Sequence, residues 1–154
     1  MQGMIGHHAQ ALDMTALVPS RTQRDDIRKL ALRIEVSQAD EIGMMQHWLE
    51  ARGQNVPGPH AMHGHGATGV TMMPGMLTAD EMARLANANG LEFDRLFLTG
   101  MIKHHGGALI MVRDLFATPG AGQEAEMFAF ASDVDADQRM EIDRMSLMLQ
   151  ELPK

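Results

Sequence analysis

Apolar residues recur every three or four positions along most of the chain, which is the spacing of amphipathic helices. Alternating runs of β-branched residues, which would indicate strands, are absent from the sequence. The pattern therefore predicts an all-α protein. The expected helices cover about 1–18, 21–52, 78–90, 91–117 and 121–151.

Helix boundaries are expected where capping residues or proline interrupt the pattern. Pro19 should end the first helix, because proline cannot continue one. Ser20 with Gln23, and Thr78 with Glu81, match the capping box, in which a hydroxyl and a carboxylate or amide three residues apart cap a helix start. Both pairs are therefore predicted to begin helices.

Two segments of the chain occur twice. The sequence MIGHHAQALDM (4–14) returns as MIKHHGGALIM (101–111), and QADEIGMMQHWL (38–49) returns as QRMEIDRMSLML (138–149). Each repeat, 1–52 and 91–151, reads as a helical hairpin. We expect a single domain over 1–154, an antiparallel four-helix bundle made of two duplicated hairpins joined by a long crossover, 53–77.

The composition restricts the chemistry. The chain holds 16 methionines and 8 histidines but no cysteine, so disulfides and thiolate metal sites are excluded. A net charge of −7 argues against nucleic acid as a partner. No apolar run approaches the roughly 18 residues that a membrane span requires.

The repeated histidine pairs are the candidate chemistry. On a helix Met4 and His8 lie about 6 Å apart along the axis, close enough to converge on one ion, whereas His7 and Met14 lie about 10 Å apart. The motif alone is therefore half a site, which Met45 of the following helix could complete. The first repeat offers Met4, His7, His8, Met14 and Met45, and the second offers Met101, His104, His105, Met111 and Met145.

Imidazole and thioether are soft, uncharged ligands. They favour copper(I), with silver(I) as its mimic and copper(II) as a further oxidation state, over the hard ions that prefer carboxylate oxygens. The Gly- and Pro-rich crossover also contains histidines and methionines, so it is either a capture segment for metal or a solvated loop. Its candidate ligands are His60, Met62, His63, His65, Met72, Met73 and Met76.

Other residues of these types have more ordinary expectations. We expect the Gln and Glu residues of the second motif to hydrogen bond with the histidines or between helices, because carboxylates commonly orient ligating histidines. His47 is expected to be exposed and Trp48 to close one end of the bundle. The residues concerned are Gln38, Glu41, Gln138 and Glu141, and those assigned to the core are Met44, Met127, Met140 and Met148.

These repeated motifs, together with FDRLFLTGMIKHH, resemble the domain-of-unknown-function 305 family, which includes CopM-like copper-binding proteins. The resemblance covers most of the chain outside the crossover. It implies a ferritin-like helical bundle, export from the cytoplasm, and copper or silver binding by the ligands just named from the two repeats. The two halves differ where Met148 stands in place of Trp48.

The resulting hypothesis is a periplasmic or secreted copper-binding protein for metal sequestration, transport or tolerance, from which a targeting segment has been removed. A second copy of the chain and another copper-handling protein are the expected protein partners. A di-iron oxidase is disfavoured because no Glu-x-x-His occurs, and a zinc hydrolase because no His-Glu-x-x-His occurs. No enzyme is therefore expected, and the alternative is a structural or protein-interaction module with a methionine-rich core.

Overall fold

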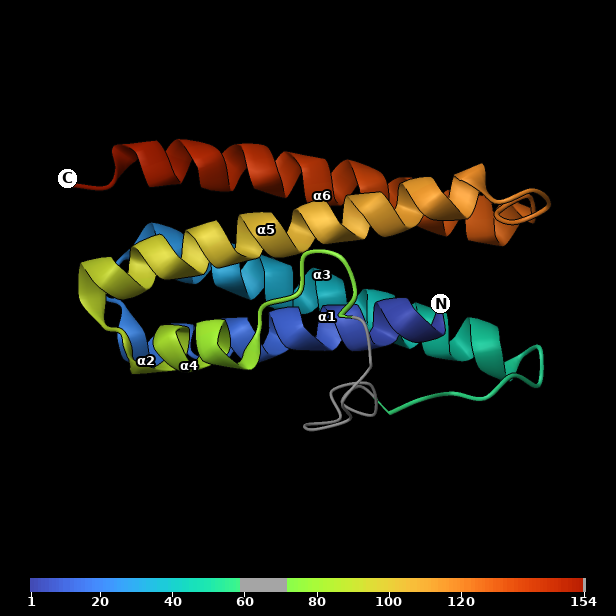
Figure 1. Ribbon diagram of the computed structural model, residues 1–154, viewed down its shortest axis with the longest axis horizontal. Helices are drawn as coiled ribbons and strands as arrows, with labels where there is room; N and C mark the ends of the chain where they lie inside the picture. The colour runs from blue at the N-terminus through green and yellow to red at the C-terminus, as the bar shows by residue number, and fades with distance from the viewer. Residues whose placement is uncertain (59–71, 154) are drawn as a thin grey trace.

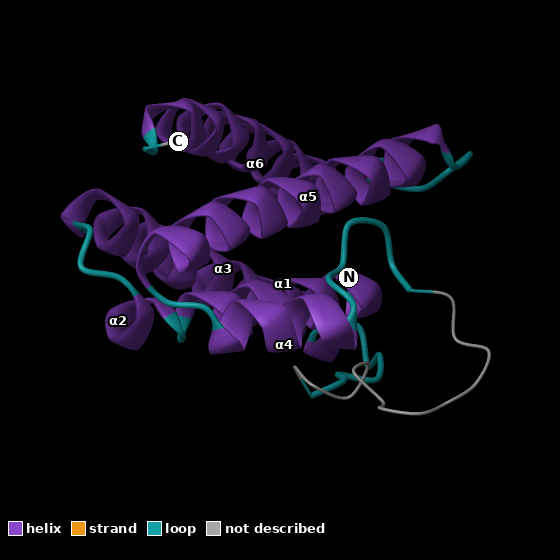
Figure 2. Cartoon of the chain, turned by 60° about the vertical axis from the view of Figure 1, so that its left-hand side comes forward, coloured by secondary structure: helices purple, strands orange, loops and turns teal. Residues whose placement is uncertain are grey.

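Four long helices form two hairpins that lie against each other (Figure 1). The computed structural model describes residues 1–58 and 72–153. The long helices are α1 (Gln2–Thr15), α3 (Asp25–Glu50), α5 (Gly90–Ala117) and α6 (Ala125–Glu151), and the short ones are α2 (Val18–Arg21) and α4 (Ala79–Asn87). Helix α1 packs against α3, α5 packs against α6, and α1 also contacts α5. The described residues include no strand, so the expected all-α four-helix bundle is confirmed (Figure 2).

The start of α3 differs from the expectation. Ser20 does not cap it, because Ser20 lies inside α2 and its hydroxyl donates to the Leu17 carbonyl at 3.1 Å. Pro19 occupies the first turn of α2, where its missing N–H costs nothing, and so it starts a short helix there. Helix α3 begins only at Asp25, whose carboxylate in the first turn interacts favourably with the helix dipole.

The capping box at the start of α4 is confirmed. The Thr78 hydroxyl accepts from the Glu81 amide at 3.1 Å, and a Glu81 carboxylate oxygen accepts from the Thr78 amide at 2.7 Å. This cap matters for the site because α4 follows directly on the last part of the crossover. It fixes the point at which the chain leaves the crossover and turns into the second hairpin.

The core consists of two separate apolar clusters. One contains Phe93 and Phe97, and the other contains Ile5 and Phe130. On each of the four long helices the residues of one cluster are followed by polar residues and then by residues of the other cluster. The layer between the clusters, called here the polar layer, consists of His7, His8, Gln38, Glu41, His104, His105, Gln138 and Glu141. None of the described helices is long and apolar enough to cross a membrane.

Candidate metal centre

The polar layer is buried throughout, although every member carries hydrogen-bonding groups. All four histidines are 0% exposed, and Glu41, the most exposed member, reaches only 8%. Burying polar groups is costly unless they are paired, so the partners of each side chain decide what the layer can do.

Each hairpin contains a histidine–glutamate pair, and the two pairs occupy equivalent positions of the two repeats. His8 Nε2 lies 2.5 Å from Glu41 Oε2, and His105 Nε2 lies 2.7 Å from Glu141 Oε2. Each glutamate comes from the second helix of the hairpin whose first helix carries the histidine. The expectation that these glutamates bind the paired histidines is therefore confirmed for both repeats.

His7 and His104 meet at the interface between the hairpins. Their ring centroids are 3.9 Å apart. His7 Nε2 donates to the Pro74 carbonyl at 3.0 Å, and His104 Nε2 donates to the His7 carbonyl at 2.9 Å. Because a carbonyl can only accept, Nε2 carries the hydrogen in both rings, and in a neutral ring the lone pair is then on Nδ1.

These two rings are neutral at physiological pH. Burial, and after it the positive charge that His8 carries when protonated, lowers the pKa of His7 to about 3. Burial likewise holds the pKa of His104 well below its ordinary value, followed by the influence of His7. A neutral imidazole is the form that binds metal, so neither ring needs to lose a proton first.

All four histidines leave the second ring nitrogen unused. The Nδ1 atoms of His7, His8, His104 and His105 are buried and have no hydrogen-bond partner among the described residues. A histidine that ligates metal through one nitrogen commonly donates its other N–H to a carboxylate or a backbone carbonyl. The Nε2 contacts therefore match those of ligating histidines, and the Nδ1 of each ring is the nitrogen whose lone pair is available to a metal ion.

The histidines do not form a complete site by themselves. Among the described residues no three His, Asp or Glu side chains lie close enough together to hold one ion. A site at any Nδ1 therefore needs a thioether or a main-chain group as a further ligand. The amides Gln38 and Gln138 are buried in the same layer, with both polar atoms of Gln38 and Oε1 of Gln138 unpartnered.

The methionines predicted as ligands separate into two groups. Four are fully buried in the apolar clusters, Met14, Met101 and Met145 in one and Met45 in the other. Met4 belongs to the same cluster as Met45 and Met111 packs against that cluster, and both of them also line a cavity. The prediction that a methionine completes a histidine site is tested by none of these positions and stays a prediction.

The last part of the crossover is fixed on the bundle beside the histidines. His7 holds the Pro74 carbonyl, and Gln10 holds Leu77 from both sides, donating to its carbonyl at 2.9 Å and accepting from its amide at 2.7 Å. Gly75 crosses Gly107 of α5 so closely that a Cβ on Gly107 would lie 1.9 Å from the Pro74 carbonyl oxygen. Glycine is required there because no side chain fits.

This attachment brings a crossover methionine to the bundle. The Met73 sulfur lies 3.4 Å from the point that a Cβ on Gly3 would occupy, and the Met111 methyl lies 3.8 Å from the same point. Met73 and Met76 are half-buried, and Met72 is 48% exposed. The other crossover candidates, His60, Met62, His63 and His65, lie outside the described residues.

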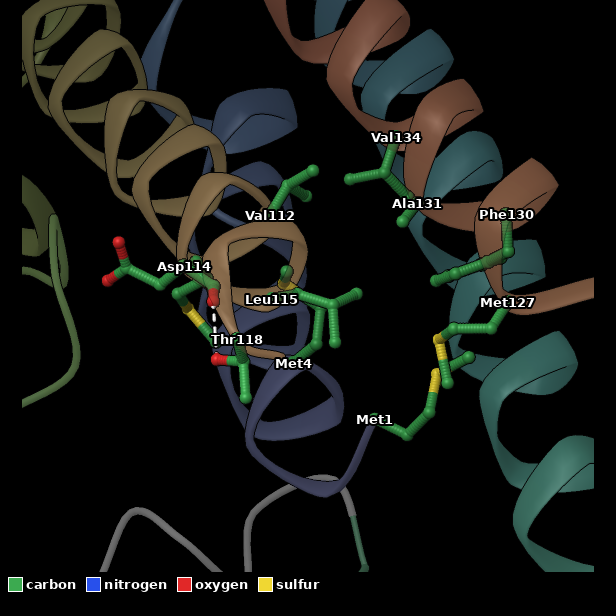
Figure 3. A pocket seen from close by; sticks show the side chains of 11 residues that line it. Met1, Met4, Val112, Asp114, Leu115, Thr118, Met127, Phe130, Ala131 and Val134 are labelled. Carbon is green, nitrogen blue, oxygen red and sulfur yellow. Dashed lines mark hydrogen bonds between the residues drawn. The ribbon is translucent and has the colours of Figure 1, made fainter. Parts of the chain in front are cut away.

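A cavity of about 320 Å³ opens between α1, α5 and α6, and four methionines line it (Figure 3). Two of them, Met1 and Met127, are absent from the sequence-based set of ligands. Met127 was expected in the core, and it is half-buried on the face of α6 that also carries Phe130, Ala131 and Val134. The sequence does not reveal which side chains of other helices this face meets. The methionines at the cavity are Met1, Met4, Met111 and Met127.

The remaining expectations have mixed outcomes. His47 is exposed, and Met148 is 1% exposed in the core, as expected. Met44 and Met140, assigned to the core, are 56% and 46% exposed, so that assignment is wrong. Trp48 is partly buried against the second cluster and donates from Nε1 to Glu124 at 3.2 Å, so it joins α3 to the residue before α6.

The chain is similar to one described protein family and to several solved structures. A family described as domain of unknown function (DUF305) matches residues 1–149. A DUF305 fragment from Deinococcus radiodurans is 33% identical, with a TM-score of 0.81, over 98% of this chain and 93% of that one. A DUF305 protein from Streptomyces coelicolor, described as a candidate secreted protein, is 29% identical, with a TM-score of 0.82, over 97% and 89%.

A further similar structure has been solved with metal. CopM in its Cu(I)-bound form is 28% identical to this chain, with a TM-score of 0.72, over 97% of this chain and 95% of CopM. CopM has also been solved in Cu(II)-bound and silver-bound forms. No curated protein matches the sequence.

Proposed function

This chain belongs to the domain-of-unknown-function 305 family, and from that premise we propose that it binds copper outside the cytoplasm and serves as a carrier or buffer, not as an enzyme. Copper(I) is the oxidation state that suits its ligands, and silver(I) is the mimic. The copper- and silver-bound forms of CopM support this class of ion. The candidate secreted protein among the relatives supports the location.

The observation that carries the proposal is the shared state of the four buried histidines. Each uses Nε2 for a carboxylate or a carbonyl, and each leaves Nδ1 unpartnered. An unpaired buried polar atom destabilises a protein by about 1–3 kcal/mol, so four such atoms at equivalent positions of two repeats call for an explanation. A soft metal ion at Nδ1 explains them.

Glu41 and Glu141 have a defined role in this proposal. Each carboxylate accepts from Nε2, which fixes the ring and increases the electron density at Nδ1. The ligands of a copper(I) ion would be Nδ1 atoms together with methionine thioethers from the two repeats. The thioethers do not titrate, so the charge of the site changes only through its histidines.

Burial requires that the bundle open for copper to reach the layer. The crossover attachment at Pro74 is a natural place for this, because His7 holds it and lies at the buried interface between the hairpins. The histidines and methionines of the crossover would capture copper and pass it inward. That role of the crossover remains a prediction.

The full burial of the histidines favours one alternative, a structural role. A polar layer that is satisfied only in one arrangement can fix how two hairpins pack, without any ligand. In that case the layer would contribute specificity to the fold, and the exposed methionines Met44 and Met140 would serve protein contacts. The two functions differ in whether the histidine layer responds to copper.

Anaerobic titration with copper(I) against a competing chelator tests the proposal. Affinity should fall in the double variants His7→Ala/His8→Ala and His104→Ala/His105→Ala, and should not change in His47→Ala, a matched control for an exposed helical histidine. Far-UV circular dichroism verifies that each variant is folded. Equal affinity in all four proteins would show that the paired histidines are not ligands.

Silver provides a test that needs no variant. A ligand that binds only the folded state stabilises it by about 2.7 kcal/mol at about 100 times its Kd. We expect the wild-type melting temperature to rise on addition of silver(I) and not on addition of magnesium. An unchanged melting temperature at excess silver would favour the structural alternative.

A further inference from the structure

We propose that the cavity lined by Met1, Met4, Met111 and Met127 is a second soft-metal site, made of thioethers alone and separate from the histidine layer. The inference rests on the proposed function in one respect, that the chain encounters copper(I). It adds a site at the end of the bundle and two ligands, Met1 and Met127, that lie outside the repeated motifs. We call these four residues the methionine cavity.

Methionine is strongly concentrated at this place. Four of the 11 residues that line the cavity are methionines, against 16 of 154 in the whole chain. The four come from different parts of the sequence: Met1 directly precedes α1, Met4 lies in its first turn, and α5 and α6 contribute one each. Because they come from three helices, their convergence is a property of the fold and not of one helical stripe.

Three of the four methionines are partly exposed, and Met4 is 9% exposed. The side chains of Met1, before α1, and Met127, of α6, point toward one another (Figure 3). Met1, Met111 and Met127 are half-buried, in contrast to the four histidines, which are fully buried. An ion can therefore enter the methionine cavity without opening of the bundle.

The rest of the lining excludes hard ions. It is mainly apolar, with Val112, Leu115 and Phe130 among the methionines. The carboxylate of Asp114 points away from the cavity (Figure 3). The Thr118 hydroxyl is engaged with the Asp114 carbonyl at 2.7 Å. Thioethers in such surroundings suit copper(I) or silver(I), whereas Mg²⁺ and Ca²⁺ require oxygen ligands.

The cavity also connects to the crossover. The Met73 sulfur and the Met111 methyl lie within 4 Å of the same point beside Gly3, so a crossover thioether stands next to one of the cavity methionines. The three anchors at Pro74, Gly75 and Leu77 hold it there. Copper captured at Met73 could pass to Met111 by exchange of one thioether for another.

Methionine methyl groups report on this site directly. In protein labelled with ¹³C at the methionine methyls, silver(I) should shift the Met111 and Met127 signals, assigned from Met111→Leu and Met127→Leu. In chelator competition the double variant Met111→Leu/Met127→Leu should bind about tenfold more weakly or lose one equivalent of copper(I), since leucine keeps the volume and removes the donor.

The matched control is Met44→Leu/Met140→Leu, which removes two exposed methionines outside the cavity and should bind as the wild type does. Unshifted Met127 methyl signals at saturating silver would overturn the inference, and would be the result if the cavity instead accepted an uncharged apolar molecule. Metal binding that depends on the paired histidines, with an unaffected Met111→Leu/Met127→Leu protein, would overturn the inference and leave the proposed function standing. A wild-type protein that binds neither ion would overturn both.

Discussion

The imidazole rings of His7 and His104 lie against each other with centroids 3.9 Å apart, although 97 residues separate them in the chain. The contact joins the same position of the two repeats. Its asymmetry is equally informative, because His104 donates to the first hairpin whereas His7 donates to the crossover. The two repeats are therefore equivalent in their histidine–glutamate pairs and different in the carbonyls to which His7 and His104 donate.

The neutral state of these rings makes the stability of the fold depend on pH. The pKa of His7 is lowered to about 3, and that of His104 is also lowered, so the unfolded chain takes up protons near pH 6.5 that the folded protein does not. The contribution of these two neutral rings to the free energy of unfolding is therefore fully present above that pH. It is lost as the pH decreases from about 6.5 toward 3, by about 1.4 kcal/mol per pH unit for each histidine.

Urea unfolding at pH 7.5, 6, 5.5 and 5 measures this slope. The carboxylates whose pKa is lowered, Asp26 and Glu81, lose their contribution to stability mainly below about pH 4.5, where they take up protons in the unfolded chain, so they add little to this slope. His47→Ala should leave the slope unchanged because His47 is exposed. A free energy of unfolding that stays constant from pH 7.5 to 5 would contradict the buried neutral state of His7 and His104.

Neighbouring glycines of α5 should respond in opposite directions to alanine. A Cβ on Gly107 would lie 1.9 Å from the Pro74 carbonyl oxygen and 2.7 Å from Gly75 Cα, and a backbone that is anchored on both sides cannot yield easily. Gly107→Ala should therefore destabilise by about 1–3 kcal/mol or more and release the crossover. Gly106 has nothing within 4 Å, so Gly106→Ala should stabilise by about 0.5–1 kcal/mol.

Thermal melts of the two variants beside the wild type give the comparison. Limited proteolysis separates local from global effects, because cleavage in the crossover should become faster in Gly107→Ala alone. If both alanine variants melt alike, the close crossing of Gly75 and Gly107 is not present in solution.

The sequence was sufficient to predict the helical hairpins and the histidine–glutamate contacts of the polar layer. Helical periodicity and the repeated motifs predicted the hairpins, and the tendency of carboxylates to orient ligating histidines predicted the contact of Glu41 that the structure has. The Ser20 prediction failed because the local motif competes with Pro19, which starts a helix of its own in the same residues. A capping signal such as Ser20 can be outweighed by an adjacent proline that favours a helix start.

The rest depends on contacts between segments far apart in the sequence. Nothing near His7 in the chain indicates that its partner is the carbonyl of Pro74, because that contact exists only when the crossover returns to α1. Met127 begins a stripe that faces the core, and the stripe does not show that Met1 lies across from it. Periodicity identifies which face of a helix is buried and not what it is buried against.

Gln10 should matter for the crossover as much as the histidine does. Its amide pairs with both the carbonyl and the amide of Leu77 in a buried position, so Gln10→Leu would leave two main-chain groups without partners. Each such group costs about 1–3 kcal/mol. We expect a loss of about 2–4 kcal/mol and faster hydrogen exchange at the Leu77 amide. An equal exchange rate in the wild type and the variant would show that Gln10 does not hold Leu77.

Replacing each glutamate of the polar layer by glutamine separates metal binding from packing. Glutamine keeps an oxygen that accepts from Nε2, so the rings of His8 and His105 should stay in place, while the carboxylate charge that strengthens Nδ1 as a donor is lost. Under the proposed function, Glu41→Gln and Glu141→Gln each weaken copper(I) binding by about 10–100-fold with little change in melting temperature. Under the structural alternative, melting temperature falls and copper binding does not depend on either residue.

The two variants should also differ from each other. Arg33 Nε lies 3.9 Å from Glu141 Oε1, whereas Glu41 is paired only with His8 among the ion pairs of the described residues. Part of the Glu141 charge is thus already balanced by a cation, so its loss should weaken copper(I) binding less than the loss of Glu41 does. Arg33→Gln should move affinity in the opposite direction by making Glu141 more available to His105. Equal effects of Glu41→Gln and Glu141→Gln, with none from Arg33→Gln, would show that the charge of these carboxylates is not what the histidines use.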